Sequence, residues 1–205
     1  METDTKETKR DKCETVLLQE TTNGRNEYEE ALTLLEKQRT SEAIELLNRC
    51  IVAMPRDPVM LYARAVTHIA TADYRKAACD LLKSIAIDRT QLHAWKQLGF
   101  VQFMLGKEDA ALKTLKQALE IDPNYAPVYT VLGDIYIDRA QFSEAKEAFE
   151  KALELDPDQV EPHSKLAMYY VARGDMKGLK REYEILKTLD ASLAEQIRTL
   201  FFDVP

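Results

Sequence analysis

The sequence repeats itself at an interval of 34 residues, and this repeat limits the folds open to the chain. The segment that begins at Trp95 reads WKQLGF and closes with ALEIDPNY, and the segment that begins at Tyr129 reads YTVLGDIY and closes with ALELDPDQ. Seven pairs of positions agree in residue type at this offset without a gap: Trp95 and Tyr129, Leu98 and Leu132, Gly99 and Gly133, Ala111 and Ala145, Leu115 and Phe149, Ala118 and Ala152, Pro123 and Pro157. The period predicts small structural units that stack on one another, because one unit alone cannot bury its apolar face.

The same frame extends in both directions from this pair of segments. Upstream, alanine and leucine keep the small and large positions, and downstream leucine, alanine and tyrosine keep them. We therefore predict five repeats: 24–57, 58–91, 92–125, 126–159 and 160–193.

Each repeat has the spacing of two helices rather than of strands. In the fourth repeat, apolar residues recur at intervals of three and four from Tyr129 onward, and again from Ala145 onward. A turn near residues 140–142 joins the two stripes, and Gly106 and Gly174 mark the same turn in neighbouring repeats. Each repeat is thus predicted to be a helix–turn–helix hairpin.

Small and bulky residues alternate at fixed places in the hairpins. Gly99 and Gly133 lie on first helices, where the missing side chain lets another helix approach closely. Trp95, Tyr129 and Phe149 are bulky and are expected to fill the space between hairpins.

The two ends of the chain differ from the repeats. Residues 1–23 are polar apart from the cluster Val16, Leu17 and Leu18, so we expect a flexible tail. The range 191–205 holds an amphipathic pattern that predicts a capping helix over the last hairpin, followed by a short tail.

Composition then narrows the class of protein. No apolar run approaches the roughly 18–20 residues that a membrane span needs, and the start of the chain has no signal-peptide pattern. Three scattered cysteines favour a reducing compartment, so we expect a cytoplasmic protein. The net charge of −7 argues against a nucleic-acid partner, because phosphate groups need an excess of Lys and Arg.

The residues that recur in this frame resemble the tetratricopeptide repeat (TPR) family over residues 24–193. The resemblance implies an all-α fold, a right-handed superhelical solenoid of helix–turn–helix repeats with a C-terminal capping helix. The second and fifth repeats depart from the family pattern: Arg64 stands where Leu is usual, His68 where Tyr is usual, and Gly178 lies within a predicted helix. The pattern therefore fixes the helix boundaries of these two repeats less closely than those of the third and fourth repeats.

In the family, the first helices line a concave groove that binds a segment of a partner protein. Carried onto this chain, the groove residues are Tyr28, Leu32, Tyr62, Val66, Ile69, Lys96, Phe100, Phe103, Met104, Thr130, Asp134, Ile137, Asp138 and Met168. Many of them are apolar although hairpin stacking does not require it. Two interpretations stay open: these residues pack on neighbouring helices, or they form an apolar trough for a partner. Asp134 and Asp138, one turn apart, are expected to accept a Lys or Arg of the partner.

A subgroup of the family binds chaperone tails through a clamp of Lys, Asn and Arg side chains. No three consecutive repeats of this chain supply that set: Lys96 fits one position, but Phe100 and Val131 stand where the clamp has Asn. We therefore do not expect binding of chaperone tails by this clamp.

Nothing in the sequence indicates catalysis. Phosphate-binding loops, nucleophile elbows and HExxH patterns are absent, so we expect no catalytic residues and no enzyme activity. No Cys or His has a partner at metal-ligand spacing, and neither a metal nor a cofactor is expected. His68 and Cys50 occupy positions of the repeat that predict packed core groups.

The sequence therefore predicts a non-catalytic scaffold or adaptor that holds a protein or peptide segment in its groove. The alternative is a self-associating scaffold, a homo-oligomer in which the tail or terminal helix of one copy fills the groove or end of the next.

Overall fold

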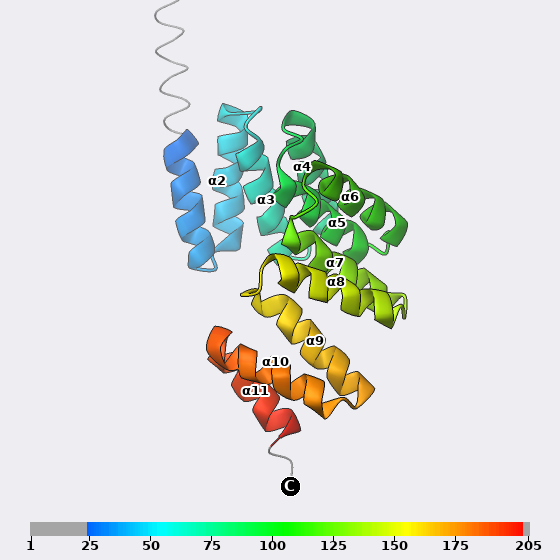
Figure 1. The fold of residues 1–205 in the computed structure, drawn as a ribbon. Helices are drawn as coiled ribbons and strands as arrows, with labels where there is room; N and C mark the ends of the chain where they lie inside the picture. The colour runs from blue at the N-terminus through cyan, green and yellow to red at the C-terminus, as the bar shows by residue number, and fades with distance from the viewer. Residues whose placement is uncertain (1–23, 203–205) are drawn as a thin grey trace, which may run out of the picture. The chain divides into compact units, whose positions relative to one another are not determined.

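The computed structural model describes residues 24–202, and these residues form α-helices and connecting turns without a strand (Figure 1). The predicted tail 1–23 and residues 203–205 lie outside the described residues. The chain divides into two compact units, an N-terminal unit that ends at Lys107 and a C-terminal unit that begins at Glu108. The all-α fold class predicted from the sequence is confirmed.

The N-terminal unit consists of successive helical hairpins. Its helices are residues 24–36, α2 (Thr40–Ala53), α3 (Pro58–Ala70), α4 (Tyr74–Ile87) and α5 (Leu92–Met104). One buried cluster centres on Leu47 and a second on Leu81. Cys50 is fully buried, as expected, and its Sγ donates a hydrogen bond to the carbonyl oxygen of Gly24 at 3.3 Å.

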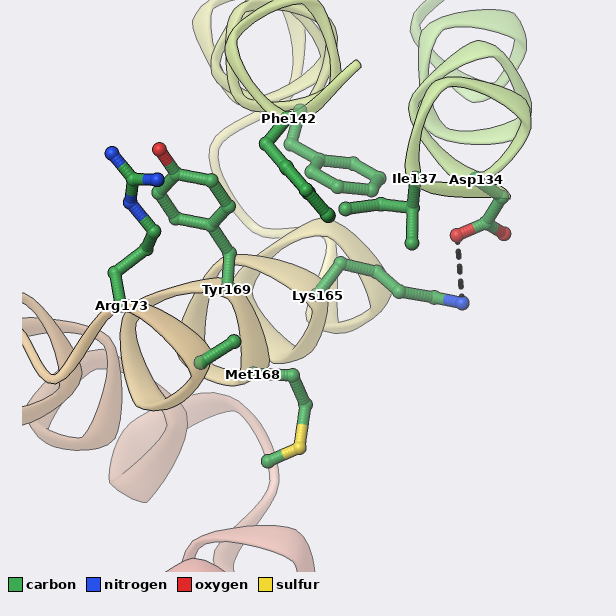
Figure 2. A pocket seen from close by; sticks show the side chains of 9 residues that line it. Asp134, Ile137, Phe142, Lys165, Met168, Tyr169 and Arg173 are labelled. Carbon is green, nitrogen blue, oxygen red and sulfur yellow. Dashed lines mark ion pairs between the residues drawn. The ribbon is translucent and has the colours of Figure 1, made fainter. Parts of the chain in front are cut away.

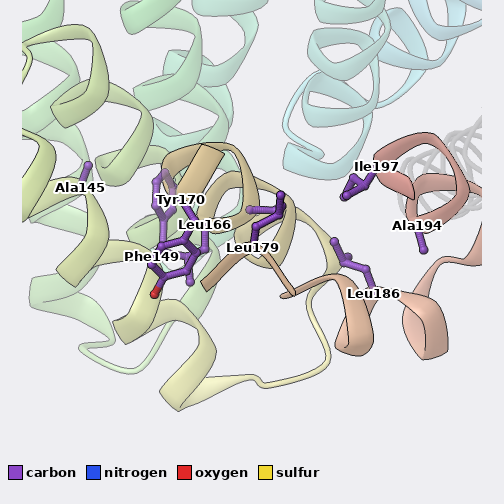
Figure 3. Packing of buried hydrophobic residues seen from close by; sticks show 9 residues of the cluster. Ala145, Phe149, Leu166, Tyr170, Leu179, Leu186, Ala194 and Ile197 are labelled. Atoms are coloured by element: carbon purple, nitrogen blue, oxygen red, sulfur yellow. The ribbon is translucent and has the colours of Figure 1, made fainter. Parts of the chain in front are cut away.

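The C-terminal unit continues the pattern and ends in a single helix. Its helices are α6 (Glu108–Ile121), α7 (Ala126–Asp138), α8 (Phe142–Leu155), α9 (Val160–Arg173), α10 (Met176–Leu189) and α11 (Ala191–Phe201). One buried cluster runs from Phe149 of α8 through Leu179 of α10 to Ile197 of α11 (Figure 3). Helix α11 thus covers the apolar face of α10, as predicted for a capping helix.

The turn between the two helices of each hairpin has the same backbone shape throughout residues 24–202. A residue with positive φ recurs at Gln38, Ala72, Gly106, Ala140 and Gly174, with φ between 57° and 70°. These positions are 34 residues apart. The left-handed conformation reverses the chain after each first helix. Glycine adopts this conformation without strain, so Gly106 and Gly174 indicate the turn in the sequence. Alanine or glutamine at the same position gives no such signal.

Two glycines let an aromatic ring lie directly on a helix backbone. A Cβ atom built on Gly133 of α7 would lie 2.3 Å from Cε1 of the fully buried Phe149, so the predicted close approach at Gly133 is confirmed. A Cβ atom on Gly178 would lie 2.4 Å from Cδ1 of Tyr170. Gly178 therefore does not interrupt α10; it makes room for the tyrosine ring of α9.

The aromatic position near the start of the first helix has a second role besides packing. Trp95 Nε1 donates to the carbonyl oxygen of Arg89 at 2.8 Å, and Tyr129 OH donates to that of Pro123 at 2.9 Å. One repeat later, His163 Nε2 lies 2.9 Å from the carbonyl oxygen of Pro157. In each case the ring contacts the carbonyl six residues upstream and fixes the loop that enters the helix.

His68 is buried in the N-terminal unit, as expected from its position in the repeat. Burial lowers the pKa of His68, and the nearby carboxylates Asp80 and Asp73 only partly oppose this shift. The folded chain therefore keeps this imidazole neutral at a pH where the unfolded chain, with a pKa of about 6.5, binds a proton.

We expect this histidine to make the protein less stable in acid. The contribution of His68 is fully present above about pH 6.5 and is lost as the pH falls towards its lower folded-state pKa. His68→Tyr, which restores the usual residue, should lessen the loss of unfolding free energy between pH 7 and pH 5 in urea titrations. An unchanged pH dependence in this variant would contradict the expectation.

Candidate functional site

A pocket lies between α7, α8 and α9 of the C-terminal unit and has a volume of about 350 Å³ (Figure 2). It is lined by Asp134 and Ile137 from α7, Phe142 and Phe149 from α8, and Lys165, Met168, Tyr169, Ala172 and Arg173 from α9. Ile137 exposes 38% of its surface, and Phe142 and Met168 each expose 44%. Large apolar side chains left open on three helices at one place form a surface that an apolar group of a partner can cover.

One end of the pocket carries an ion pair. Lys165 Nζ extends from α9 and lies 2.8 Å from Asp134 Oδ1 of α7 (Figure 2). The pair joins the first helices of two successive repeats across the pocket and neutralises the charge of both groups. Asp134 is thus already matched by a base of the chain itself, which weakens the prediction that it attracts a Lys or Arg of a partner.

The other end of the pocket carries a cation and a ring. Figure 2 shows the Arg173 side chain beside the ring of Tyr169, one helical turn apart on α9. Arg173 is exposed, so its guanidinium stays hydrated at the rim. The pocket therefore has an apolar centre between a neutralised pair and a cationic edge.

The groove residues predicted for the C-terminal unit are divided by the structure. Asp134, Ile137 and Met168 line the pocket. Asp138 is exposed but is not part of the lining. Thr130 is 1% exposed and its Oγ1 has no hydrogen-bond partner among residues 24–202, so this side chain points into the protein and is not open to a partner.

The groove residues predicted for the N-terminal unit fall into two groups. Half-buried side chains that pack against the apolar clusters are Tyr28, Tyr62, Ile69 and Phe100. Side chains outside that packing are the exposed Leu32 and Met104 and the half-buried Val66, Lys96 and Phe103. Burial raises the pKa of Tyr62, so its phenol stays neutral at ordinary pH. The packing interpretation therefore holds for the first group, whereas a trough for a partner stays a prediction for the second group.

Sequence reasoning missed one flank of α9. Lys165, Tyr169 and Arg173 follow one another at intervals of four and so form one stripe on the helix. They lie one residue after the stripe that the family pattern assigns to the groove. The reason is geometric: α7 presents its groove-facing flank to the pocket, whereas α9 also presents the flank that turns back towards α7. The spacing of these three side chains was the available signal.

Neither a metal site nor a membrane-spanning helix is found among the residues that the structure describes. Residues 24–202 hold no cluster of three or more His, Cys, Asp or Glu side chains that could bind a metal ion. Within the same residues, each helix is too short or too polar to cross a membrane.

The fold and the pocket define a class of protein, a helical-hairpin repeat protein with an apolar surface on its first helices. A sequence profile of the tetratricopeptide repeat family matches residues 102–169. The crystal structure of a thermophilic TPR protein from Thermus thermophilus has the same fold, with a TM-score of 0.75 at 24% identity over 86% of this chain and 97% of that chain. Residues 102–169 are therefore tetratricopeptide repeat sequence, and the chain has the fold of a TPR protein.

Curated relatives share only part of their length with this chain. Anaphase-promoting complex subunit 3 of Schizosaccharomyces pombe is 32% identical over 99 residues, which are 47% of this chain and 14% of the relative. Hsp70-Hsp90 organizing protein 2 of Arabidopsis thaliana is 29% identical over 101 residues, which are 49% of this chain and 18% of the relative. The chain thus matches less than a fifth of either protein.

Proposed function

We propose that this chain is a non-catalytic interaction module whose C-terminal unit holds an apolar segment of a partner protein in the pocket between α7 and α9. The observation that carries the proposal is the set of open apolar side chains from three helices around one cavity of about 350 Å³. That volume suits one or two large side chains, which is the usual scale of an anchor in helix-in-groove binding.

The rim of the pocket supports a specific polarity for the bound segment. The Asp134–Lys165 pair leaves one end without net charge, and Arg173 makes the other end cationic. A segment with two bulky apolar residues and an acidic residue towards Arg173 complements this arrangement. The curated relatives are by name a subunit of the anaphase-promoting complex and an Hsp70-Hsp90 organizing protein. Both names are consistent with a role in holding other proteins.

The test is a pair of matched double variants used as bait in affinity capture with mass spectrometry. Ile137→Asp with Met168→Asp places two charges in the pocket and is expected to abolish capture of the dominant partner. Ile185→Asp with Met176→Asp changes the same residue types at similar exposures, 39% and 48%, outside the pocket, and should leave capture intact. Equal capture by both double variants would rule the pocket out as the binding site.

The same variants separate a foreign partner from a second copy of the chain. Sedimentation of the wild-type chain over a concentration series measures self-association. If the chain forms oligomers that only the pocket variant disrupts, the occupant is another copy, and the protein is a self-associating scaffold instead.

A further inference from the structure

A second cleft lies in the N-terminal unit, between α2, α3 and α4, and has a volume of about 480 Å³. Its lining is Ile44, Asn48, Arg64, His68, Arg75, Lys76, Cys79, Asp80 and Lys83. Four of these nine residues are Lys or Arg and one is an acid. This cleft differs from the pocket of the C-terminal unit in both position and charge.

The floor of the cleft is a polar network that replaces apolar residues of the repeat. Arg64 Nε and Nη2 donate to the two carboxylate oxygens of Asp80 at 2.7 Å each, and Nη1 donates to Asn48 Oδ1 at 2.7 Å. At intervals of 34 residues from Arg64 stand Leu98 and Leu166, both buried. The departure of Arg64 from the family pattern therefore opens a polar floor where other repeats are filled with leucine.

Stability alone does not explain this network. Replacing a buried ion pair by apolar residues of similar size is often neutral or stabilising, so the chain gains little folding free energy from it. What the network achieves is a fixed orientation of Arg64. The contacts above engage three of the five N–H groups of the guanidinium, and two N–H groups remain for another acceptor.

Exposed cations stand above this floor on α4. Arg75 and Lys83 are exposed, lie two helical turns apart on the same stripe, and form no ion pair with a carboxylate of residues 24–202. Lys76 Nζ, by contrast, is held by Asp73 at 2.6 Å. The cleft therefore presents two unpaired charges and one pre-oriented guanidinium around a single cavity.

We propose that this cleft binds anionic side chains of a partner polypeptide, either carboxylates or phosphorylated Ser or Thr. Arg64 supplies a fixed donor pair, Arg75 and Lys83 supply charge, and Ile44 supplies an apolar wall for the peptide chain. A polypeptide fits better than a nucleic acid, because residues 24–107 carry 12 Lys and Arg against 10 Asp and Glu, and the whole chain carries −7.

The inference does not rest on the function proposed for the C-terminal unit. On α3, Arg64 and Val66 are two residues apart and so point about 200° away from each other. The cleft thus opens on the face of α3 opposite the predicted groove residues Tyr62 and Val66. A variant that abolishes binding at one site should therefore leave binding at the other site intact, and the two can be measured separately.

The experiment uses the full chain and fluorescence anisotropy with four labelled probes at low and high salt. The probes are a decapeptide of alternating Glu and Ser, its counterpart with Gln for Glu, the Gln peptide with two phosphoserines, and a ten-nucleotide single-stranded RNA. Arg75→Glu with Lys83→Glu should weaken binding of the acidic or the phosphorylated peptide by at least about tenfold, since like charges then face each other. Lys37→Glu with Arg56→Glu, also exposed residues of this unit, changes the net charge equally and should weaken it far less.

Cys79 gives a readout at the cleft itself. It is exposed and lines the cleft, whereas Cys50 is buried. A bound peptide should slow the alkylation of Cys79 by N-ethylmaleimide. Peptide mass spectrometry measures the extent of this alkylation over time. Arg64→Leu with Asp80→Ala, which reproduces Leu132 and Ala148 of a later repeat, should keep the fold and abolish this protection.

The anionic peptide that binds identifies the ligand group: the Glu peptide indicates carboxylates and the phosphopeptide indicates phosphate. The proposal is overturned if neither peptide binds, if the Gln peptide binds equally, or if both charge-reversal variants lose binding to the same extent. Tighter binding of the RNA than of either anionic peptide also overturns it.

Discussion

Glu182→Ala is expected to lower the free energy of unfolding by about 3–5 kcal/mol, the usual cost of removing one partner of a buried, hydrogen-bonded acid–base pair. Glu182 Oε2 lies 2.7 Å from His163 Nδ1, and both side chains are almost fully buried. His163 Nε2 contacts the carbonyl oxygen of Pro157, which can only accept, so Nε2 carries a proton. Removing Glu182 leaves Nδ1 buried opposite an empty space.

The chain contains its own replacement for this pair. One repeat earlier, Tyr129 makes the carbonyl contact, and Ala148 stands at the position equivalent to Glu182. His163→Tyr alone leaves the carboxylate of Glu182 buried without its base and should also be strongly destabilising. The double variant His163→Tyr with Glu182→Ala restores the earlier repeat's pair, and we expect it to be more stable than either single variant.

Urea denaturation at pH 7 of the four members of this cycle measures the coupling. Glu184→Ala is the control on the same helix, because Glu184 pairs with Lys187 at the surface and should cost less than about 1 kcal/mol. If the loss of unfolding free energy in the double variant equals the sum of the two single losses, the pair has no special coupling.

Two buried carboxylates at the same position of the repeat have different roles. Asp80 and Glu182 occupy equivalent places in their second helices, where another repeat has Ala148. Glu182 contacts the buried His163, and the pair lies inside the protein. Asp80 meets Arg64, whose side chain is 18% exposed and reaches a cleft. The first pair is therefore structural, whereas the second holds a donor at the surface.

The helices were predictable because their signal is local and periodic. The 34-residue frame and the spacing of apolar residues by three and four indicate which residues face inward. Gly106 and Gly174 indicate the turn. Ala140 in the same left-handed conformation was not a local signal; only the frame points to it. Gly178 departs from the family pattern for a reason that the sequence does not show, because its role is a contact with Tyr170, which no local pattern records.

The pocket was predictable only in part. Ile137 and Met168 follow from the family's groove positions and line the cavity. Tyr169 and Arg173 were missed because they depend on how α9 is turned towards α7, a relation between two helices that sequence spacing does not give. Thr130 occupies a groove position yet is buried, since the rotation of α7 brings it against its neighbours.

Phe149→Ala is expected to cost about 3–5 kcal/mol, because the ring is fully buried and its removal leaves a cavity. Gly133→Ala is the more informative change. Alanine normally stabilises a helix relative to glycine by about 1 kcal/mol. Here the new Cβ would lie 2.3 Å from the Phe149 ring, so we expect a loss of about 1–3 kcal/mol instead.

The N-terminal unit shows which pair tolerates alanine at this place. Ala31 packs in one cluster with Leu47, and Ala65 packs in another with Leu81, at positions equivalent to Gly133 and Phe149. The double variant Gly133→Ala with Phe149→Leu adds a methyl group on the helix and replaces the ring by a smaller side chain. Its free energy of unfolding should lie within about 1.5 kcal/mol of that of the wild-type chain. Urea denaturation of the single and double variants measures this recovery. If Gly133→Ala proves as stable as the wild-type chain, the ring does not lie on the α7 backbone as the structure has it.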